Sequence, residues 1–194
     1  MYYLLALLLF ASCGYRYPSE EEITYSQTIS IPYIAGDPDG ILNNELTYQL
    51  SASGKFCPAQ SRGDLILQVV ILSDTHERIG FRYDRDNPSG DLEKNLLGVE
   101  DCRMVIAEVS VIERGSDKVI LGPCEVRASV DYDYTDPGSP RDLLFAKTQP
   151  IMPFSLGQLD SQEGAHDDSA RPLFKILSQK IVIGLVSKLP EIFP

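Results

Sequence analysis

The sequence predicts an α+β fold, a two-layer sandwich in which two helices pack on one face of a mixed four-stranded sheet. Three segments alternate apolar and polar residues with the period of a β-strand, and a fourth is a short β-branched run that is nearly all apolar. Two others repeat apolar residues with the period of an α-helix. Their order along the chain is β-α-β-β-β-α. A first strand joined to the second through a helix favours a right-handed parallel crossover, and the later strands are expected to pair antiparallel. Two helices on one face of the sheet is the simplest two-layer packing.

The first strand is predicted over residues 28–33, where Ile29, Ile31 and Tyr33 alternate with other residues and so share one face. Pro32 cannot donate a hydrogen bond to a neighbouring strand, which favours an edge position or a strand end. A dense turn of glycine, aspartate and proline then separates this strand from the first helix.

The first helix is predicted over residues 40–53, with Asp39 as its N-cap and Gly54 as its C-terminal stop. Helical spacing brings one set of residues near a single face, namely Leu42, Leu46, Gln49, Leu50 and Ser53. This face is the one expected to pack on the sheet.

The second strand is predicted over residues 64–72, which are β-branched and nearly all apolar, so that much of both faces is expected to be covered. The alternation of Ile79, Phe81 and Tyr83 with charged or small residues allows this strand to continue. Residues 84–98 contain an Asn-Pro-Ser-Gly sequence and several charges, and they are predicted as a loop or a hairpin tip.

The third and fourth strands are predicted over residues 102–113 and 118–134, joined by a turn at 114–117. Alternating apolar residues mark their inward faces. Gly122 and Pro123 interrupt the fourth strand and predict a bulge or a bend there.

Residues 135–167 are predicted as a long loop, because they lack periodicity and are rich in proline, glycine, aspartate and serine. Two stretches within them, 143–145 and 151–154, are too apolar for a plain linker. Packing against the domain's own core and docking onto a partner are the two explanations for these stretches.

The last helix is predicted over residues 170–189. Pro172 is acceptable only in the first turn of a helix, and Pro190 is expected to end it. The stripe that faces the core is formed by Leu173, Phe174, Leu177, Ile181, Leu185 and Lys188.

The N-terminus has the features of a bacterial lipoprotein signal. An apolar run from Leu4 to Phe10 is followed by two small residues and then by Cys13. The run is far too short to cross a ~30 Å hydrocarbon core, and it fits the apolar region of a signal peptide. Residues 1–12 are therefore predicted as a signal peptide, and Cys13 as the lipidated first residue of the mature chain. Two or more acyl chains, palmitate among them, anchor a protein stably to a membrane.

The remaining chain of about 180 residues is long enough for one domain with its own core. It is divided into a tether over residues 13–27, a single domain over 28–189 that includes the long loop, and a tail over 190–194. The formal net charge is −11, which argues against a general nucleic-acid binder because phosphate contacts need clustered lysine and arginine. An anionic ligand has to be met by a local basic patch.

Three cysteines follow Cys13, namely Cys57, Cys102 and Cys124. An odd number permits at most one internal disulfide and leaves one thiol. In a regular hairpin Cys102 opposes residue 129 and Cys124 opposes residue 107, so the two are out of register and no bond is predicted between them.

No catalytic, metal or cofactor site is predicted. The sequence has no Gly-x-Ser-x-Gly elbow, phosphate-binding glycine loop, His-Glu-x-x-His motif or Cys-x-x-Cys pair. Asp74, His76 and Glu77 are the best acid–base cluster, but a histidine between carboxylates at a strand end is more often a solvated surface. His166 and the two aspartates after it precede the last helix, where acidic residues stabilise the positive end of the helix dipole.

One basic segment stands out against the acidic background, and it contains Arg78, Arg82 and Arg85. If the segment is a regular strand, Arg78 and Arg82 share one face, and Arg85 shares the other with Ile79, Phe81 and Tyr83. Guanidinium groups beside apolar and aromatic side chains suit an amphiphile that carries phosphate groups and acyl chains. The alternative is pairing with nearby carboxylates, namely Asp74, Glu77, Asp84 and Asp86.

Cys13 is followed directly by Gly14-Tyr15-Arg16, and then by the predicted strand, helix, three strands and helix. In these features the chain resembles the LptE family of lipopolysaccharide-assembly lipoproteins. In element order the resemblance covers nearly the whole mature chain, although its literal motif is short. The acidic balance of this chain departs from the family, and basic residues that bind lipopolysaccharide in other members cannot be matched here position by position.

The resemblance implies a non-enzymatic lipoprotein on the periplasmic face of the outer membrane. It would plug the lumen of a β-barrel translocon of the LptD type, help the barrel to assemble and contact lipopolysaccharide in transit. Two alternatives remain: a lipoprotein regulator of a cell-wall synthase or a secretion channel, and a periplasmic hydrolase. The hydrolase requires a pocket in which His76 or His166 meets a nucleophile.

Overall fold

The computed structural model describes residues 27–85, 91–134, 144–145, 149–150 and 161–192. The predicted signal peptide, Cys13 and almost all of the tether lie outside the described residues. So do the apolar stretch 151–154 and the last two residues of the tail.

The predicted α+β architecture with a mixed sheet is confirmed, but the sheet has five strands instead of four. Their order across the sheet is β2-β1-β3-β4-β5. The strands are β1 (Gln27–Ser30), β2 (Phe56–Ala59), β3 (Leu65–Arg85), β4 (Leu92–Glu113) and β5 (Lys118–Asp133). The first two pairings, β1 with β2 and β1 with β3, are parallel, and the other two are antiparallel. Separately, β6 (Leu144–Phe145) pairs with β7 (Gln149–Pro150).

The fifth strand, β2, was not predicted. It has only four residues, one of them Pro58, and it shows no alternation of apolar and polar residues. It exists because the chain that leaves the first helix runs beside β1, with Gln27 opposite Phe56. Phe56 is buried and seals this end of the core.

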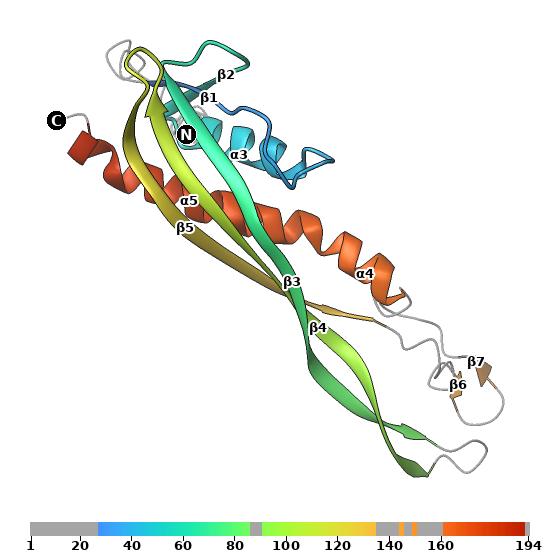
Figure 1. Ribbon diagram of the computed structural model, residues 1–194. Helices are drawn as coiled ribbons and strands as arrows, with labels where there is room; N and C mark the ends of the chain where they lie inside the picture. Colours follow the sequence, from blue (N-terminus) through green and yellow to red (C-terminus); the bar gives the residue numbers. More distant parts are fainter. Residues whose placement is uncertain (1–26, 86–90, 135–143, 146–148, 151–160, 193–194) are drawn as a thin grey trace, which may run out of the picture.

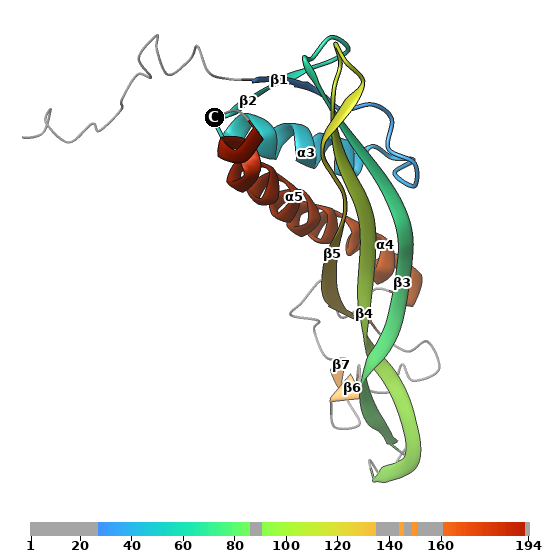
Figure 2. The same ribbon diagram turned by 60° about the vertical axis from the view of Figure 1, so that its left-hand side comes forward.

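The helices lie together on one face of the sheet, as Figures 1 and 2 show. They are α3 (Ile41–Ala52), α4 (Gln162–Asp168) and α5 (Ala170–Ile192). The core lies between this layer and the sheet. Its most buried members include Leu42, Leu46 and Leu50 from α3, Leu173, Leu177 and Ile181 from α5, and Leu67, Val105 and Ala107 from the strands.

Three predicted boundaries are corrected. The first strand ends at Ser30, before Pro32, and Tyr33 is 78% exposed and does not share the core face with Ile29. The end of the predicted long loop is helical, because α4 begins at Gln162. The last helix starts at Ala170 as expected, but it runs to Ile192, so Pro190 lies in its last turns and does not end it.

The N-terminus of α3 is capped by Asp37 and not by the predicted Asp39. The N-cap residue Gly40 has a φ of 70°, and its position offers no side-chain hydrogen bond. Instead the backbone N–H of Asn43 donates to Oδ2 of the buried Asp37 over 2.9 Å. The carboxylate therefore satisfies one of the free N–H groups of the first turn.

Replacing Asp37 with alanine should lower the free energy of unfolding by about 1 kcal/mol, the usual cost of removing a side-chain cap. The matched control is Asp39→Ala, at an exposed position of the same turn. Urea denaturation of both variants measures the difference. An equal loss of stability in the two variants would show that the cap has been assigned to the wrong residue.

Two irregularities in the pairing of β3 with β4 change which residues face the helices. Residue 72 is inserted between the pairs Ile71–Ala107 and Ser73–Ile106, and residue 79 between the pairs Arg78–Asp101 and Gly80–Glu100. An extra residue reverses the alternation of the bulged strand. The helix-covered face of β3 therefore passes from Leu65, Leu67, Val69 and Ile71 to Asp74, His76 and Arg78.

The β3–β4 hairpin extends well beyond the end of β5. The last pair between β4 and β5 joins Glu100 to Asp133, whereas β3 and β4 stay paired as far as Arg85 and Leu92. Residues 80–85 and 92–99 thus form a two-stranded projection, here called the ribbon, at the lower end of Figure 1. The sequence predicted a loop or a hairpin tip over 84–98; these residues lie at the end of the β3–β4 hairpin, and of those described, 84–85 and 92–98 are strand.

The cysteines of the β4–β5 hairpin do not lie opposite the residues expected. Cys102 opposes Asp131 and Cys124 opposes Val109, each two residues from the regular register. The shift arises in two steps of one residue each: Ile120 is inserted between the pairs Ile112–Val119 and Val111–Leu121, and at the predicted bulge Gly122 and Pro123 together oppose Ser110. The two thiols are thus seven residues apart along β4, about 23 Å at ~3.3 Å per residue, which is too far for a disulfide.

Candidate functional site

A buried polar junction lies where α4 meets the middle of β3 and β4 and the end of β5. The irregularity at Leu72 places Asp74, His76 and Arg78 on the helix-covered side of β3. Ser161 accepts a hydrogen bond from the backbone N–H of Gly164 over 3.1 Å and so fixes the start of α4. The junction is therefore built from a strand bulge and a capped helix.

Asp101 is the centre of the junction, with a side chain only 1% exposed. The Tyr134 hydroxyl donates to Oδ1 over 3.0 Å, and the Gln162 amide donates to Oδ2 over 2.9 Å. The Tyr132 hydroxyl lies 3.4 Å from Oδ2, and the Arg78 guanidinium 3.7 Å from Oδ1. Each oxygen of this buried carboxylate is thus met by two groups, and the four groups come from β3, from β5 and the residue that follows it, and from α4.

The two tyrosines keep their protons to unusually high pH. Burial raises the pKa of Tyr134 above its ordinary value, and the hydrogen bond to Asp101 raises it further. The pKa of Tyr132 is raised in the same direction, first by burial and then by the negative charge of Asp101. Both hydroxyls therefore act as hydrogen-bond donors to the carboxylate.

Arg103 forms the second part of the junction, two residues after Asp101 on β4. Its guanidinium contacts both oxygens of Asp74, with Nε at 2.9 Å and Nη2 at 2.6 Å. Its Nη1 donates to the His166 carbonyl over 2.9 Å and to the Ser169 hydroxyl over 3.3 Å. Arg103 therefore holds the joint between α4 and α5 onto the sheet.

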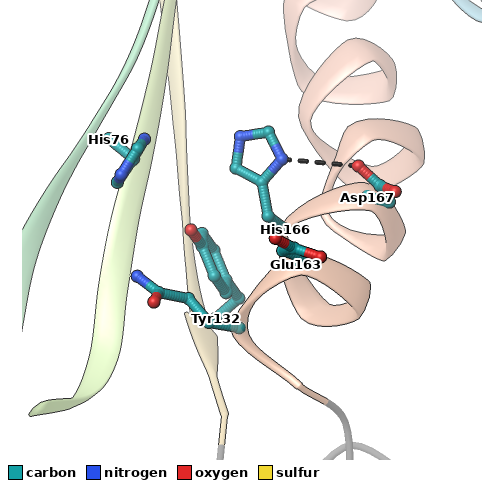
Figure 3. Close-up of a pocket in the computed structure, with 6 residues that line it drawn as sticks. His76, Tyr132, Glu163, His166 and Asp167 are labelled. Atoms are coloured by element: carbon teal, nitrogen blue, oxygen red, sulfur yellow. Dashed lines mark ion pairs between the residues drawn. The ribbon is translucent and has the colours of Figure 1, made fainter.

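A cavity of about 470 Å³ opens beside these groups, as Figure 3 shows. The rings of His76 and His166 meet edge to face with centroids 5.7 Å apart, and His166 lies 6.0 Å from the ring of Tyr132. Nδ1 of His166 also lies 3.5 Å from a carboxylate oxygen of the exposed Asp167. Residues ninety positions apart in the sequence, His76 and His166, are thus brought together.

The cavity offers aromatic and acidic groups, and its described lining has no hydroxyl of serine or threonine and no thiol. The described residues that line it are His76, Tyr132, Gln162, Glu163, His166 and Asp167. Within the described part of the chain, no group of three or more histidine, cysteine or acidic side chains is arranged to hold a metal ion. The arrangement suits a structural joint or a contact with a cationic group.

The three candidate arginines do not form one basic patch. Arg78 pairs with Asp101, a carboxylate that the sequence did not suggest for it. A side chain at Gly98 would run into Arg78, so Gly98 and its partner Phe81 lie on the helix-covered side of the ribbon. Arg82 lies on the opposite side, because it adjoins Phe81 in the strand. The predicted sharing of a face by Arg78 and Arg82 is therefore wrong, and the side chain of Arg85 lies outside the described residues.

Sequence reasoning missed Asp101, Arg103 and Gln162, which carry most of the hydrogen bonds of the junction. Charged residues at alternating strand positions normally mark the solvent side, and Gln162 fell within the predicted loop. Asp101 and Arg103 lie an even number of residues before the buried Val105 and Ala107, so a regular strand places all four on one face. This spacing was the available sign that the two charged residues face the core.

The ribbon carries an apolar surface on its helix-covered side. Phe81, Tyr83 and Leu96 share that face and are 56%, 55% and 57% exposed. The outer face of the sheet is acidic instead, with Glu108 directly opposite Glu125 and Glu100 directly opposite Asp133. Within the described residues, no helix is long and apolar enough to cross a membrane.

Comparisons with known proteins show the fold and no family. No family model matches the sequence, and no curated protein matches it either. The crystal structure of a candidate lipoprotein from Caulobacter crescentus CB15 is similar with a TM-score of 0.52 at 13% identity, covering 88% of this chain and 96% of that one. At this identity the likeness supports the fold alone.

Two further solved structures are similar at lower scores. A minor lipoprotein from Acinetobacter baumannii has a TM-score of 0.46 at 16% identity, covering 85% of this chain and 95% of that one. Rare lipoprotein B from Shewanella oneidensis has a TM-score of 0.42 at 13% identity, covering 83% and 95%.

Proposed function

We propose that this chain is a lipid-anchored, non-enzymatic assembly protein of the LptE type. It would sit on the periplasmic face of the outer membrane, held by acyl groups on Cys13, and occupy the lumen of a β-barrel translocon of the LptD type. The observation that carries the proposal is the architecture: a five-stranded mixed sheet with its helices on one side and a ribbon that projects from it. The sequence resemblance at residues 13–16 and the similar fold of a candidate lipoprotein from Caulobacter crescentus support the same proposal.

The mechanism would be steric. The buried junction joins α4 and α5 to the sheet, so the body is suited to act as a rigid plug. None of the described residues that line the cavity beside it is a serine, threonine or cysteine. The acidic outer face repels phosphate groups. Contact with lipopolysaccharide is therefore assigned to the ribbon, where Phe81, Tyr83 and Leu96 offer apolar surface and Arg82 lies on the other side.

Site-specific photo-crosslinking in outer membranes of the native host tests the proposal. A photoreactive residue at Leu96 on the ribbon is expected to crosslink to a β-barrel of the LptD type, identified by mass spectrometry. The control position is Tyr33, which is 78% exposed at the other end of the body. Crosslinks only to a cell-wall synthase or a secretion channel would refute the translocon role. An unmodified thiol at Cys13, or a retained Met1, would refute the lipid anchor.

A further inference from the structure

A second cavity lies between the two long helices, away from the polar junction. It has a volume of about 590 Å³ and lies between the end of α3 and the middle of α5. Ala52, Val182, Ile183 and Val186 line it, and Ile183 is 69% exposed. These four side chains make the groove apolar along its length, and five polar residues complete its lining: Gln49, Ser53, Lys55, Gln179 and Ser187.

The chain enters the domain at the edge of this groove. The backbone N–H of Gln27, the first residue of β1, donates to the carbonyl of Lys55 over 3.2 Å. Lys55 is itself one of the residues that line the groove. The residues immediately before Gln27 therefore start next to it.

The tether carries apolar side chains with the right spacing to reach the groove. Ile29 of β1 points into the core beneath the helices and is fully buried. Ile23 and Tyr25 have the same sequence parity as Ile29, and residues two apart in an extended chain share a face. At ~3.3 Å per residue, two residues of extended chain span about 7 Å and four residues about 13 Å. The acidic run at residues 20–22 directly precedes Ile23 in the sequence, and its negative charge is opposite to that of Lys55.

We propose that the groove between α3 and α5 is the docking site for this chain's own tether, filled by Ile23 and Tyr25. The docking itself does not require an acyl group. Under the proposed function, docking shortens the part of the tether that can separate the domain from the membrane. This part would run from Cys13 to Glu22, about 33–36 Å when extended, instead of from Cys13 to Ser26, about 46–50 Å. The tether would thus hold the end of the body that contains the groove toward the membrane.

Amide hydrogen exchange of the full-length chain in detergent micelles tests the docking. Peptides covering residues 20–27 are expected to exchange slowly in the unmodified protein, and at least about fivefold faster in Ile183→Ser. The paired tether variant, Ile23→Ser with Tyr25→Ser, should give the same increase. The matched control is Tyr48→Ser, at a 65% exposed position of α3 that does not line the groove, and it should leave the exchange unchanged. Thermal unfolding checks that every variant remains folded.

Three results would overturn the docking. The first is full-rate exchange of residues 20–27 in the unmodified protein. The second is loss of their protection in Cys13→Ser, which would show that an acyl chain fills the groove. The third is a dimer in sedimentation velocity that dissociates in Ile183→Ser, which would assign the groove to a second copy. None of these measurements involves a barrel partner, so failure of the translocon role and failure of the docking are distinguishable.

Discussion

Arg103→Ala is expected to lower the free energy of unfolding by about 2–4 kcal/mol. Removing one partner of a buried ion pair usually costs about 3–5 kcal/mol. The expected loss of stability is smaller here because the Asp74 side chain is 34% exposed. The loss has a clear origin, since the guanidinium contacts both oxygens of Asp74 and also the His166 carbonyl and the Ser169 hydroxyl. Its removal breaks the connection from the joint between α4 and α5 to Asp74 of β3, while Gln162 at the start of α4 stays bonded to Asp101.

Urea denaturation of Arg103→Ala beside Arg127→Ala measures this effect. Arg127 is 65% exposed and pairs with Glu125 at 3.3 Å on the outer face, and such surface pairs contribute about 0–1 kcal/mol. Arg103→Lys should fall between the two, because an ammonium group cannot make the planar two-oxygen contact. If Arg103→Ala and Arg127→Ala lose the same stability, the junction does not hold the helix layer to the sheet.

The elements that follow a single period could be predicted from the sequence. The leucines at 42, 46 and 50 are spaced for one helix face, and all three are fully buried. Val105, Ala107, Val109 and Val111 alternate along β4 and are buried as well. The break at Gly122 and Pro123 was also predictable, because that pair cannot continue a regular ladder.

Two features could not be predicted because they depend on pairing between strands. A bulge adds a residue without changing the apolar or polar character of its neighbours, so nothing marks Leu72 or Ile79 as an inserted residue. The strand β2 is likewise defined by its partner β1 and not by its own composition. Without the bulges, Asp74 and His76 fall on the outer face, and the polar junction cannot be anticipated.

The candidate site shows the same limit at single residues. Arg78 was expected to meet a ligand or one of the acidic residues close to it in sequence. It meets Asp101 instead, from the facing strand. The bulge at Leu72 sets the pairing register that brings the two residues together, so the arginine's partner is a property of the fold and not of the local sequence.

Asp101→Ala is expected to lower the free energy of unfolding by about 3–4 kcal/mol. The substitution leaves the buried Tyr134 hydroxyl and the Gln162 amide without their acceptor, at about 1–3 kcal/mol for each unsatisfied group. It also leaves Arg78 without its carboxylate. The matched control is Asp133→Ala, an exposed position on the outer face of β5, which should change stability by no more than ~0.5 kcal/mol. Equal losses in the two variants would contradict the central role of Asp101.

The pH dependence of stability gives a second readout of the same carboxylate. The pKa of Tyr134 is raised in the folded protein, first by burial and then by Asp101. The contribution of Tyr134 to the free energy of unfolding is therefore fully present below the pKa that a tyrosine has in the unfolded chain, about 10. It is lost as the pH rises above that value. In Asp101→Asn the negative charge is gone while burial remains, so the decline in stability between pH 10 and 11 should become shallower but persist. An unchanged decline would show that Asp101 does not act on the tyrosine, because burial alone would then account for the whole effect.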